Sequence, residues 1–354
     1  MESFIDKTNI LMTQKIDNNL KQLKSYINDY SLLPVLEKAF INDNFIYEKR
    51  NGVPNEDFLI SNYIADLFLS FQNNKELKEP SNEEVNSIFN VCMEIVSSQM
   101  TKEMLSSTEP KKFSNHNVLF KYTERTTFIP IIEYILNEIL EPKYLDYFYK
   151  KTGFYLSDIS FFRFALTNFI YDRYESLSYN DNILMFTKDD LFSYINEHCL
   201  VKYDLNRLDK LIDYFEIRNS DNSDYLYRAN NPIEKKPIFK YKNKYICCNP
   251  LSLIKKALQI FEEELKKDEK LFSDYGNSKG QKFEELIQQV LSVFFSNSNI
   301  YHGLTYYTQD KVKHETDIIV DTGNYLLIVE AKCRVFQEKG KQGNIGSYKR
   351  SIKI

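Results

Sequence analysis

The chain has 354 residues, a net charge of −4, 26 tyrosines, 26 phenylalanines and no tryptophan. This length predicts two domains, and the acidic balance argues against a protein that binds nucleic acid over its whole surface. The five cysteines form no Cys-x-x-Cys pair, which argues against a disulfide framework and predicts free thiols and a cytoplasmic location. The amino terminus has no signal-peptide pattern, and the most apolar run, 128–140, is too short to span a bilayer, so we expect no membrane partner.

Residues 1–230 carry the spacing of amphipathic helices and predict a large all-α domain. Apolar residues recur at helical spacing in the first segment and again after a capping box that begins at Ser81. Further helices are predicted over 128–140, 156–174, 187–195 and 205–215. This part of the sequence contains no Gly-rich phosphate loop, Cys/His metal spacing or repeat, so it predicts no chemistry of its own.

The end of this domain, about 185–230, has a pattern that could form a winged-helix-like unit. Two short helices, the first capped at Thr187, are followed by a polar, turn-rich stretch. Short capped helices also occur in any helical domain, and an ordinary helical ending stays an alternative.

A domain boundary is predicted at 230/231, and 231–270 then reads as a hairpin followed by a connecting helix. The hairpin turns at Lys242-Asn243, and the helix covers 251–270. From residue 231 onward the chain has 21 Lys and Arg against 15 Asp and Glu, which leaves 25 against 35 before it. This asymmetry indicates either a carboxy-terminal part that contacts phosphates or a solvated polar tail.

The third segment, 271–354, begins with an amphipathic helix predicted over 280–295. Glu284 falls on the border of its apolar face, whereas Glu285 points away from it. Glu284 could therefore lie at a helix–sheet junction, or it could extend past the apolar face into solvent.

A strand is predicted over 299–308. It contains Tyr301, Tyr306 and Tyr307, which could line a nucleic-acid groove but are expected to serve strand packing. His302 and His314 could each act as a general base, but neither belongs to a motif, and both are interpreted as surface or packing residues.

The most informative stretch is 314–332, HETDIIVDTGNYLLIVEAK. Two runs of β-forming residues flank Gly323-Asn324, a two-residue hairpin loop of the kind that requires positive φ. If this loop is used, Thr322 pairs with Tyr325, and the strand register follows from that pair.

In this register Asp317 lies opposite Glu330, and Lys332 shares their face because strand side chains alternate. The opposite face carries the apolar residues Ile318, Val320, Leu327 and Val329. Two facing carboxylates repel by about 3–4 kcal/mol at an effective dielectric of about 20. A divalent cation would relieve this conflict, which predicts a functional site.

Asp317, followed after twelve residues by Glu330-Ala331-Lys332, resembles the signature of the PD-(D/E)XK nuclease superfamily, which has a restriction-endonuclease-like fold. The resemblance covers about the last quarter of the chain. It implies an α+β protein in which a large all-α domain precedes a truncated α/β core of one helix and a three-stranded sheet.

The resemblance also implies the site. Asp317, Glu330, the Ala331 carbonyl and Glu284 would hold Mg²⁺ or Mn²⁺, and Lys332 would orient or deprotonate the attacking water and balance charge on the phosphate. A plain edge-strand lysine is the alternative for Lys332. Basic residues after the motif would contact the phosphate backbone, namely Arg334, Lys339, Lys341, Lys349 and Arg350.

Proteins of this superfamily continue past the motif into a helix and a further strand, whereas this chain ends at Ile354. We therefore expect a core that is incomplete at its carboxy-terminal end, and an open sheet edge that could pair with a partner or a second copy.

The leading hypothesis is a magnesium-dependent DNA nuclease whose helical domain binds a partner or regulates access, by analogy in bacterial defence. A second hypothesis is a nucleic-acid-binding or assembly module that keeps the nuclease fold without activity. A third is a helical interaction protein whose carboxy-terminal part only dimerises.

Overall fold

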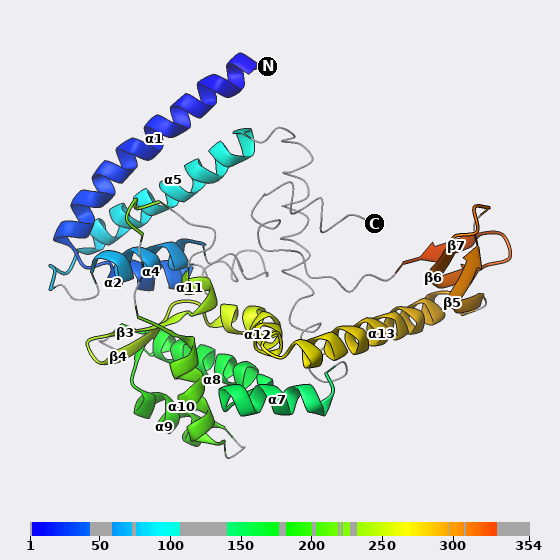
Figure 1. Ribbon diagram of the computed structural model, residues 1–354. Coiled ribbons are helices and arrows are strands. Elements are labelled where there is room, and N and C mark those ends of the chain that lie inside the picture. Colours follow the sequence, from blue (N-terminus) through cyan, green and yellow to red (C-terminus); the bar gives the residue numbers. More distant parts are fainter. Residues whose placement is uncertain are drawn as a thin grey trace. The chain divides into compact units, whose positions relative to one another are not determined.

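The computed structural model describes residues 2–42, 59–72, 76–106, 140–176, 182–199, 203–218, 220, 222–226, 232–296, 298–307 and 309–330. The chain divides into two compact units. Unit 1 comprises residues 1–132 and 149–260, and unit 2 comprises 133–148 and 261–354 (Figure 1). Helices α7 (Pro142–Thr152) and α12 (Pro250–Leu265) cross the division.

Unit 1 is mainly helical. Its elements, beside the parts of α7 and α12 that it holds, are α1 (Glu2–Asp29), α2 (Leu33–Ile41), α4 (Leu59–Phe71), α5 (Asn82–Ser106), α8 (Leu156–Glu175), β1 (Met185–Phe186), α9 (Lys188–His198), α10 (Leu205–Phe215), β2 (Glu216–Ile217), α11 (Pro232–Lys235), β3 (Ile238–Tyr241) and β4 (Lys244–Cys247). Helices α1 and α5 lie side by side (Figure 1). Helix α4 is apolar on nearly all sides and is buried almost all round, as expected for a central helix.

A buried glutamine joins the start of α2 to the end of α1. The Gln72 amide donates to the carbonyls of Ile27 and Tyr30 at 2.8 and 2.7 Å, and its oxygen accepts from the Leu32 N–H at 2.7 Å. Gln72 thereby satisfies three backbone groups that lie where the chain turns between two helices, and such groups are costly when buried without a partner.

The predicted helices of unit 1 are confirmed where the structure describes them. The Ser81 N–H donates to Glu84 Oε2 at 2.6 Å and Ser81 Oγ accepts from the Glu84 N–H at 3.3 Å, which is the expected capping box of α5. Thr187 caps α9 in the same way. The predicted helix over 128–140 lies outside the described residues, apart from its last residue.

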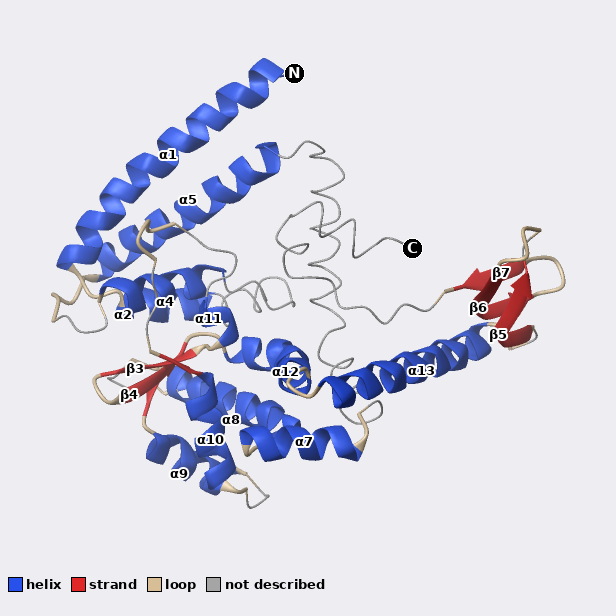
Figure 2. Ribbon diagram, viewed as in Figure 1, coloured by secondary structure: helices blue, strands red, loops and turns tan. Residues whose placement is uncertain are grey.

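The prediction that 1–230 is all-α is wrong. Strands β1 and β2 belong to a four-stranded sheet of order β1-β4-β3-β2, drawn in red in Figure 2. The hairpin β3–β4 turns at Lys242-Asn243 as predicted, and both residues have positive φ. Because β1 pairs with β4 and β2 with β3, the hairpin belongs to unit 1, and the predicted boundary at 230/231 lies inside that unit.

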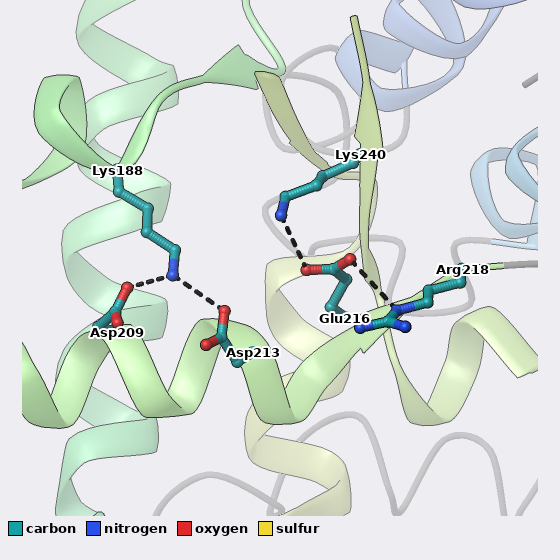
Figure 3. Close-up of polar contacts among 6 residues, drawn as sticks. All are labelled: Lys188, Asp209, Asp213, Glu216, Arg218 and Lys240. Atoms are coloured by element: carbon teal, nitrogen blue, oxygen red, sulfur yellow. Dashed lines mark hydrogen bonds and ion pairs between the residues drawn. The ribbon is translucent and has the colours of Figure 1, made fainter. Parts of the chain in front are cut away.

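Ion pairs connect the elements around this sheet. Lys188, at the start of α9, binds Asp209 and Asp213 on successive turns of α10, the second at 2.9 Å (Figure 3). Burial alone would lower the pKa of Lys188, but these two carboxylates raise it above its ordinary value.

Glu216 on β2 lies between Arg218 and Lys240, at 4.0 and 3.6 Å (Figure 3). The Lys188 and Lys240 ammonium groups both lie over the Tyr245 ring, at 5.6 and 4.8 Å from its centroid. These charges compensate one another and stabilise the junction of the sheet with α9 and α10.

Unit 2 consists of one long helix and an antiparallel meander. Helix α13 (Glu269–Phe294) precedes β5 (Asn299–Tyr307), β6 (Lys313–Asp321) and β7 (Leu326–Val329), which form a sheet of order β5-β6-β7 (Figures 1 and 2). Tyr144 and Phe148 on α7 pack on Tyr275 and Phe261 within the same unit. No helix among the described ranges is long and apolar enough to cross a membrane.

The helix boundaries in this region differ from the predicted ones. The predicted helix over 251–270 is two helices, because Asp268 accepts from the Leu271 N–H and caps the start of α13. Helix α13 begins at Glu269 and runs through Gly276 and Gly280, where the sequence predicted a start at 280.

Candidate active site

The hairpin β6–β7 has the predicted register. The Thr322 N–H donates to the Tyr325 carbonyl at 3.0 Å, and the ladder continues to the pair Ile318 and Val329. Gly323 has a φ of +83° in the two-residue loop, which permits the tight reversal. The pairing ends there, and extending the same register by one residue past β7 would set Asp317 opposite Glu330, where directly opposed Cβ atoms are about 4.5–5.5 Å apart.

The pairing of β5 with β6 extends this arrangement across the sheet. Its register is constant on both sides of Gly303, so Gly303 lies opposite Asp317 on the side away from Glu330. Gly303 has a φ of +62°, and a Cβ added there would meet nothing nearer than Glu315 Oε1, at 3.9 Å. The Asp317 carboxylate therefore has no side chain across from it on β5.

The two faces of the sheet differ in their surroundings. On β6, Thr316, Ile318 and Val320 are buried on the face that packs on α13. Asp317 alternates with them and lies on the other face, which we call the open face. Strand alternation and register assign these residues to the open face: Asn299, Tyr301, Gly303, Thr305, Tyr307, Lys313, Glu315, Asp317, Ile319, Asp321, Leu326, Ile328 and Glu330.

Water reduces the repulsion between the paired acids. Glu330 is exposed and Asp317 is half-buried. For two unit charges about 4 Å apart the repulsion in bulk water is about 1 kcal/mol, and the exposure of this pair brings its repulsion nearer to that value than to the larger one expected from the sequence. The pair is tolerable without a cation, and it remains two oxygen ligands on adjacent strands.

The structure places Glu284 beside the helix-covered face of the sheet. Its carboxylate lies 3.7 Å from Nε2 of His302, which pairs with Ile318 and so shares the buried face. Alternation sets the Asp317 side chain on the opposite side. In the part of the chain that the structure describes, no three His, Cys, Asp or Glu side chains are grouped closely enough to hold a metal ion.

The remaining predicted site residues lie outside the described residues. These are Ala331, Lys332, Arg334, Lys339, Lys341, Lys349 and Arg350. The described part of the predicted site is therefore the pair Asp317 and Glu330, with Glu284 on the other side of the sheet.

Sequence reasoning missed an apolar row next to the carboxylates. Tyr301 pairs with Ile319, which pairs with Ile328, one step along the open face from the row that contains Asp317. Tyr301 is 44% exposed, although the sequence favoured strand packing for it, and Ile328 is 62% exposed. The sequence did contain one signal: Tyr301 and Gly303 are two residues apart on a predicted strand, so their positions share one face.

A second polar cluster in unit 2 has its charges paired. The Lys143 ammonium lies 2.6 Å from Asp274 and 3.2 Å from Glu141, and these two hydrogen-bonded carboxylates raise its pKa. Asp274 also accepts from the Tyr144 hydroxyl at 3.0 Å. This arrangement joins α7 to α13 and has the character of a structural network.

Comparison with known proteins gives no relative for this chain: no family model, curated protein or solved structure matches it.

Proposed function

We propose that this protein is a metal-dependent nuclease that hydrolyses DNA, with Asp317 and Glu330 as ligands of Mg²⁺ or Mn²⁺. The observation that supports the proposal is the register of β6 and β7, which, extended by one residue past β7, would bring these two carboxylates opposite each other on an exposed sheet face. Helix α13 followed by the meander β5–β6–β7 also agrees with the expectation, drawn from the sequence motif, of one helix and a three-stranded sheet.

The donor set fits a hard divalent cation. Mg²⁺ uses one or two carboxylates and fills its remaining positions with water and phosphate oxygens, so two acids on adjacent strands suffice. When bound, the cation would polarise the phosphate and lower the pKa of a bound water. Asp317 and Glu330 would hold the cation to which the phosphodiester binds, and we assign to Lys332, on the sequence motif alone, the compensation of charge on the phosphate.

Calorimetric titration with Mn²⁺ and Mg²⁺ tests the site. We expect Asp317→Asn and Glu330→Gln each to weaken metal binding about tenfold or more and to reduce DNA cleavage about hundredfold or more, because each removes one anionic ligand without changing side-chain size.

Asp321→Asn is the matched control. Asp321 lies on the same strand and face as Asp317, and its Oδ1 accepts from the Gly323 N–H at 2.8 Å, a bond that an asparagine oxygen preserves. Equal metal affinity in all four proteins would refute the proposed site. Salt-dependent DNA binding without cleavage would favour the alternative, a nucleic-acid-binding module with a nuclease-like fold.

For unit 1 we propose a partner-binding or regulatory role. The order α8, β1, α9, α10, β3, β4, with β2 and α11 inserted between α10 and β3 and with β1 antiparallel to β4, resembles the connectivity of a winged-helix unit whose wing would be the β3–β4 hairpin. On the α10 surface Asp209 and Asp213, which are 46% and 59% exposed, share Lys188 as their ion-pair partner, so this group of three charges keeps a net negative charge that disfavours phosphates. This favours a protein partner, and cross-linking from an exposed α10 position such as Asn206 would identify it.

A further inference from the structure

We propose that the open face of the β5–β6–β7 sheet binds single-stranded nucleic acid by stacking its bases on Tyr301 and Tyr307. This inference rests on the proposed nuclease function, since it names the form of nucleic acid that the same site would accept.

The first observation is which residues of β5 share the face of Asp317. Tyr301, Gly303 and Tyr307 share one face of β5, and Gly303 is the residue opposite Asp317. Tyr301 is two residues from that position, about 6–7 Å along the strand. A nucleotide whose phosphate lies at the carboxylate pair could therefore set a neighbouring base on the Tyr301 ring.

The second observation is that both tyrosine rings are exposed to solvent. Tyr307 is 69% exposed, and Tyr301 continues into the apolar row formed by Ile319 and Ile328. Exposed aromatic rings in line on a sheet are suitable for base stacking, which contributes regardless of base identity. Because Gly303 has no side chain, no side chain of β5 rises from the sheet between Tyr301 and the position opposite Asp317.

Charge distinguishes a single strand from a duplex. Among the residues that the structure describes, the open face carries one lysine and four carboxylates, at Lys313, Glu315, Asp317, Asp321 and Glu330. A duplex presents its phosphates outward and would be repelled by this face beyond the metal position. A single strand can turn its bases toward the tyrosines and its phosphates toward solvent.

The test uses fluorescence anisotropy with labelled oligothymidine, oligouridine and a blunt DNA duplex of equal length. The full chain carries Asp317→Asn and Glu330→Gln, so that binding is measured without cleavage. In this background we expect Tyr301→Ala and Tyr307→Ala each to weaken single-strand binding about five- to hundredfold, the range found for loss of one stacked base. Tyr301→Phe keeps the ring and should bind like the parent.

Tyr306→Ala is the matched control. Tyr306 is on the same strand and is 49% exposed, but it lies on the opposite face, where its ring stacks on His314 at 5.5 Å. The absence of tryptophan from the sequence adds a direct readout, since Tyr301→Trp introduces a single indole that a stacked base should quench. Tyr306→Trp should not be quenched.

Tyr301-dependent binding of either the DNA or the RNA oligonucleotide supports the inference, and the stronger of the two identifies the sugar. Equal effects of Tyr301→Ala and Tyr306→Ala, or duplex binding as tight as single-strand binding, would overturn it. Metal-dependent cleavage that is unaffected by Tyr301→Ala would refute this inference and leave the nuclease proposal intact. If the chain binds single strands through Tyr301 but neither binds metal nor cleaves DNA, the nuclease proposal is refuted and the single-strand binding face is kept.

Discussion

The two sheets of this protein have opposite relations to solvent. In unit 1, Ile238, Phe239, Ile246 and Cys247 are fully buried, so the β3–β4 hairpin has core on both faces. In unit 2, only alternate residues of β6 are buried, and large apolar residues of β5 and β7 are exposed. A strand buried on both sides stabilises a domain, whereas a strand that exposes aromatic and aliphatic residues next to paired acids has surface available for a ligand.

Truncation of a strand side chain should give the largest difference in unfolding free energy between the two sheets. Phe239→Ala removes a fully buried ring that packs on Phe68 with centroids 5.7 Å apart, and should lower the free energy of unfolding by about 3–5 kcal/mol. Ile328→Ala on β7 should change it by no more than about 0.5 kcal/mol, because that side chain is already largely in water. Urea unfolding measures both, and similar losses would show that the exposure of β7 is not a property of the folded protein in solution.

Buried and exposed side chain–backbone hydrogen bonds should differ next. Gln72→Ala leaves three backbone groups in unit 1 without their partner and should cost about 2–4 kcal/mol. Asp321→Ala in unit 2 removes one exposed bond to the Gly323 N–H, which water can replace, and should cost less than about 1 kcal/mol. Thermal unfolding compares the two variants, and a larger loss in Asp321→Ala would reverse the expected order.

Alkaline pH should destabilise unit 1 selectively. Burial raises the pKa of the Cys92 and Cys247 thiols to about 12 and also raises that of Cys248. These thiols stay neutral in the folded chain, whereas in the unfolded chain they ionise near the ordinary thiol pKa. Ionisation therefore favours the unfolded chain, so the free energy of unfolding is unaffected by these thiols below about pH 8 and falls as pH rises from about 9 to 12. The loss per thiol is at most about 1.4 kcal/mol per pH unit. Hydrogen exchange at pH 7 and pH 10 should show faster opening of β4 than of β6, and unchanged β4 protection would contradict the assignment.

Two glycines of unit 2 should respond in opposite directions. Gly303→Ala places a side chain at a φ of +62° and should cost about 1 kcal/mol. Gly276→Ala lies inside α13, where a Cβ meets nothing within 4 Å, and should stabilise by about 0.5–1 kcal/mol. Differential scanning calorimetry would detect both shifts, and a neutral Gly303→Ala would mean that β5 relaxes freely at this residue.

The sequence predicted the β6–β7 register because a two-residue loop fixes pairing and parity together. It could not predict β1 and β2, which have two residues each and gain their identity only from partners distant in the chain. The helix start predicted at 280 was wrong, because α13 begins at Glu269 and passes through Gly276 and Gly280, where the flanking turns carry the helix. The exposure of Tyr301 was also beyond reach, since periodicity reveals which residues share a face and not whether another layer covers it.

The interleaving of the two units along the chain has a practical consequence for dissecting the protein. A fragment that starts at residue 261 would lose 133–148, and with it the Tyr144 and Phe148 rings that pack on Tyr275 and Phe261. A single cut at 261 would thus expose the aromatic rings near the start of α13 to solvent, and such exposed apolar surface promotes aggregation. Supplying 133–148 in trans as a synthetic peptide, or grafting it ahead of residue 261 through a flexible tether, is the rational way to isolate the carboxy-terminal module for biochemistry.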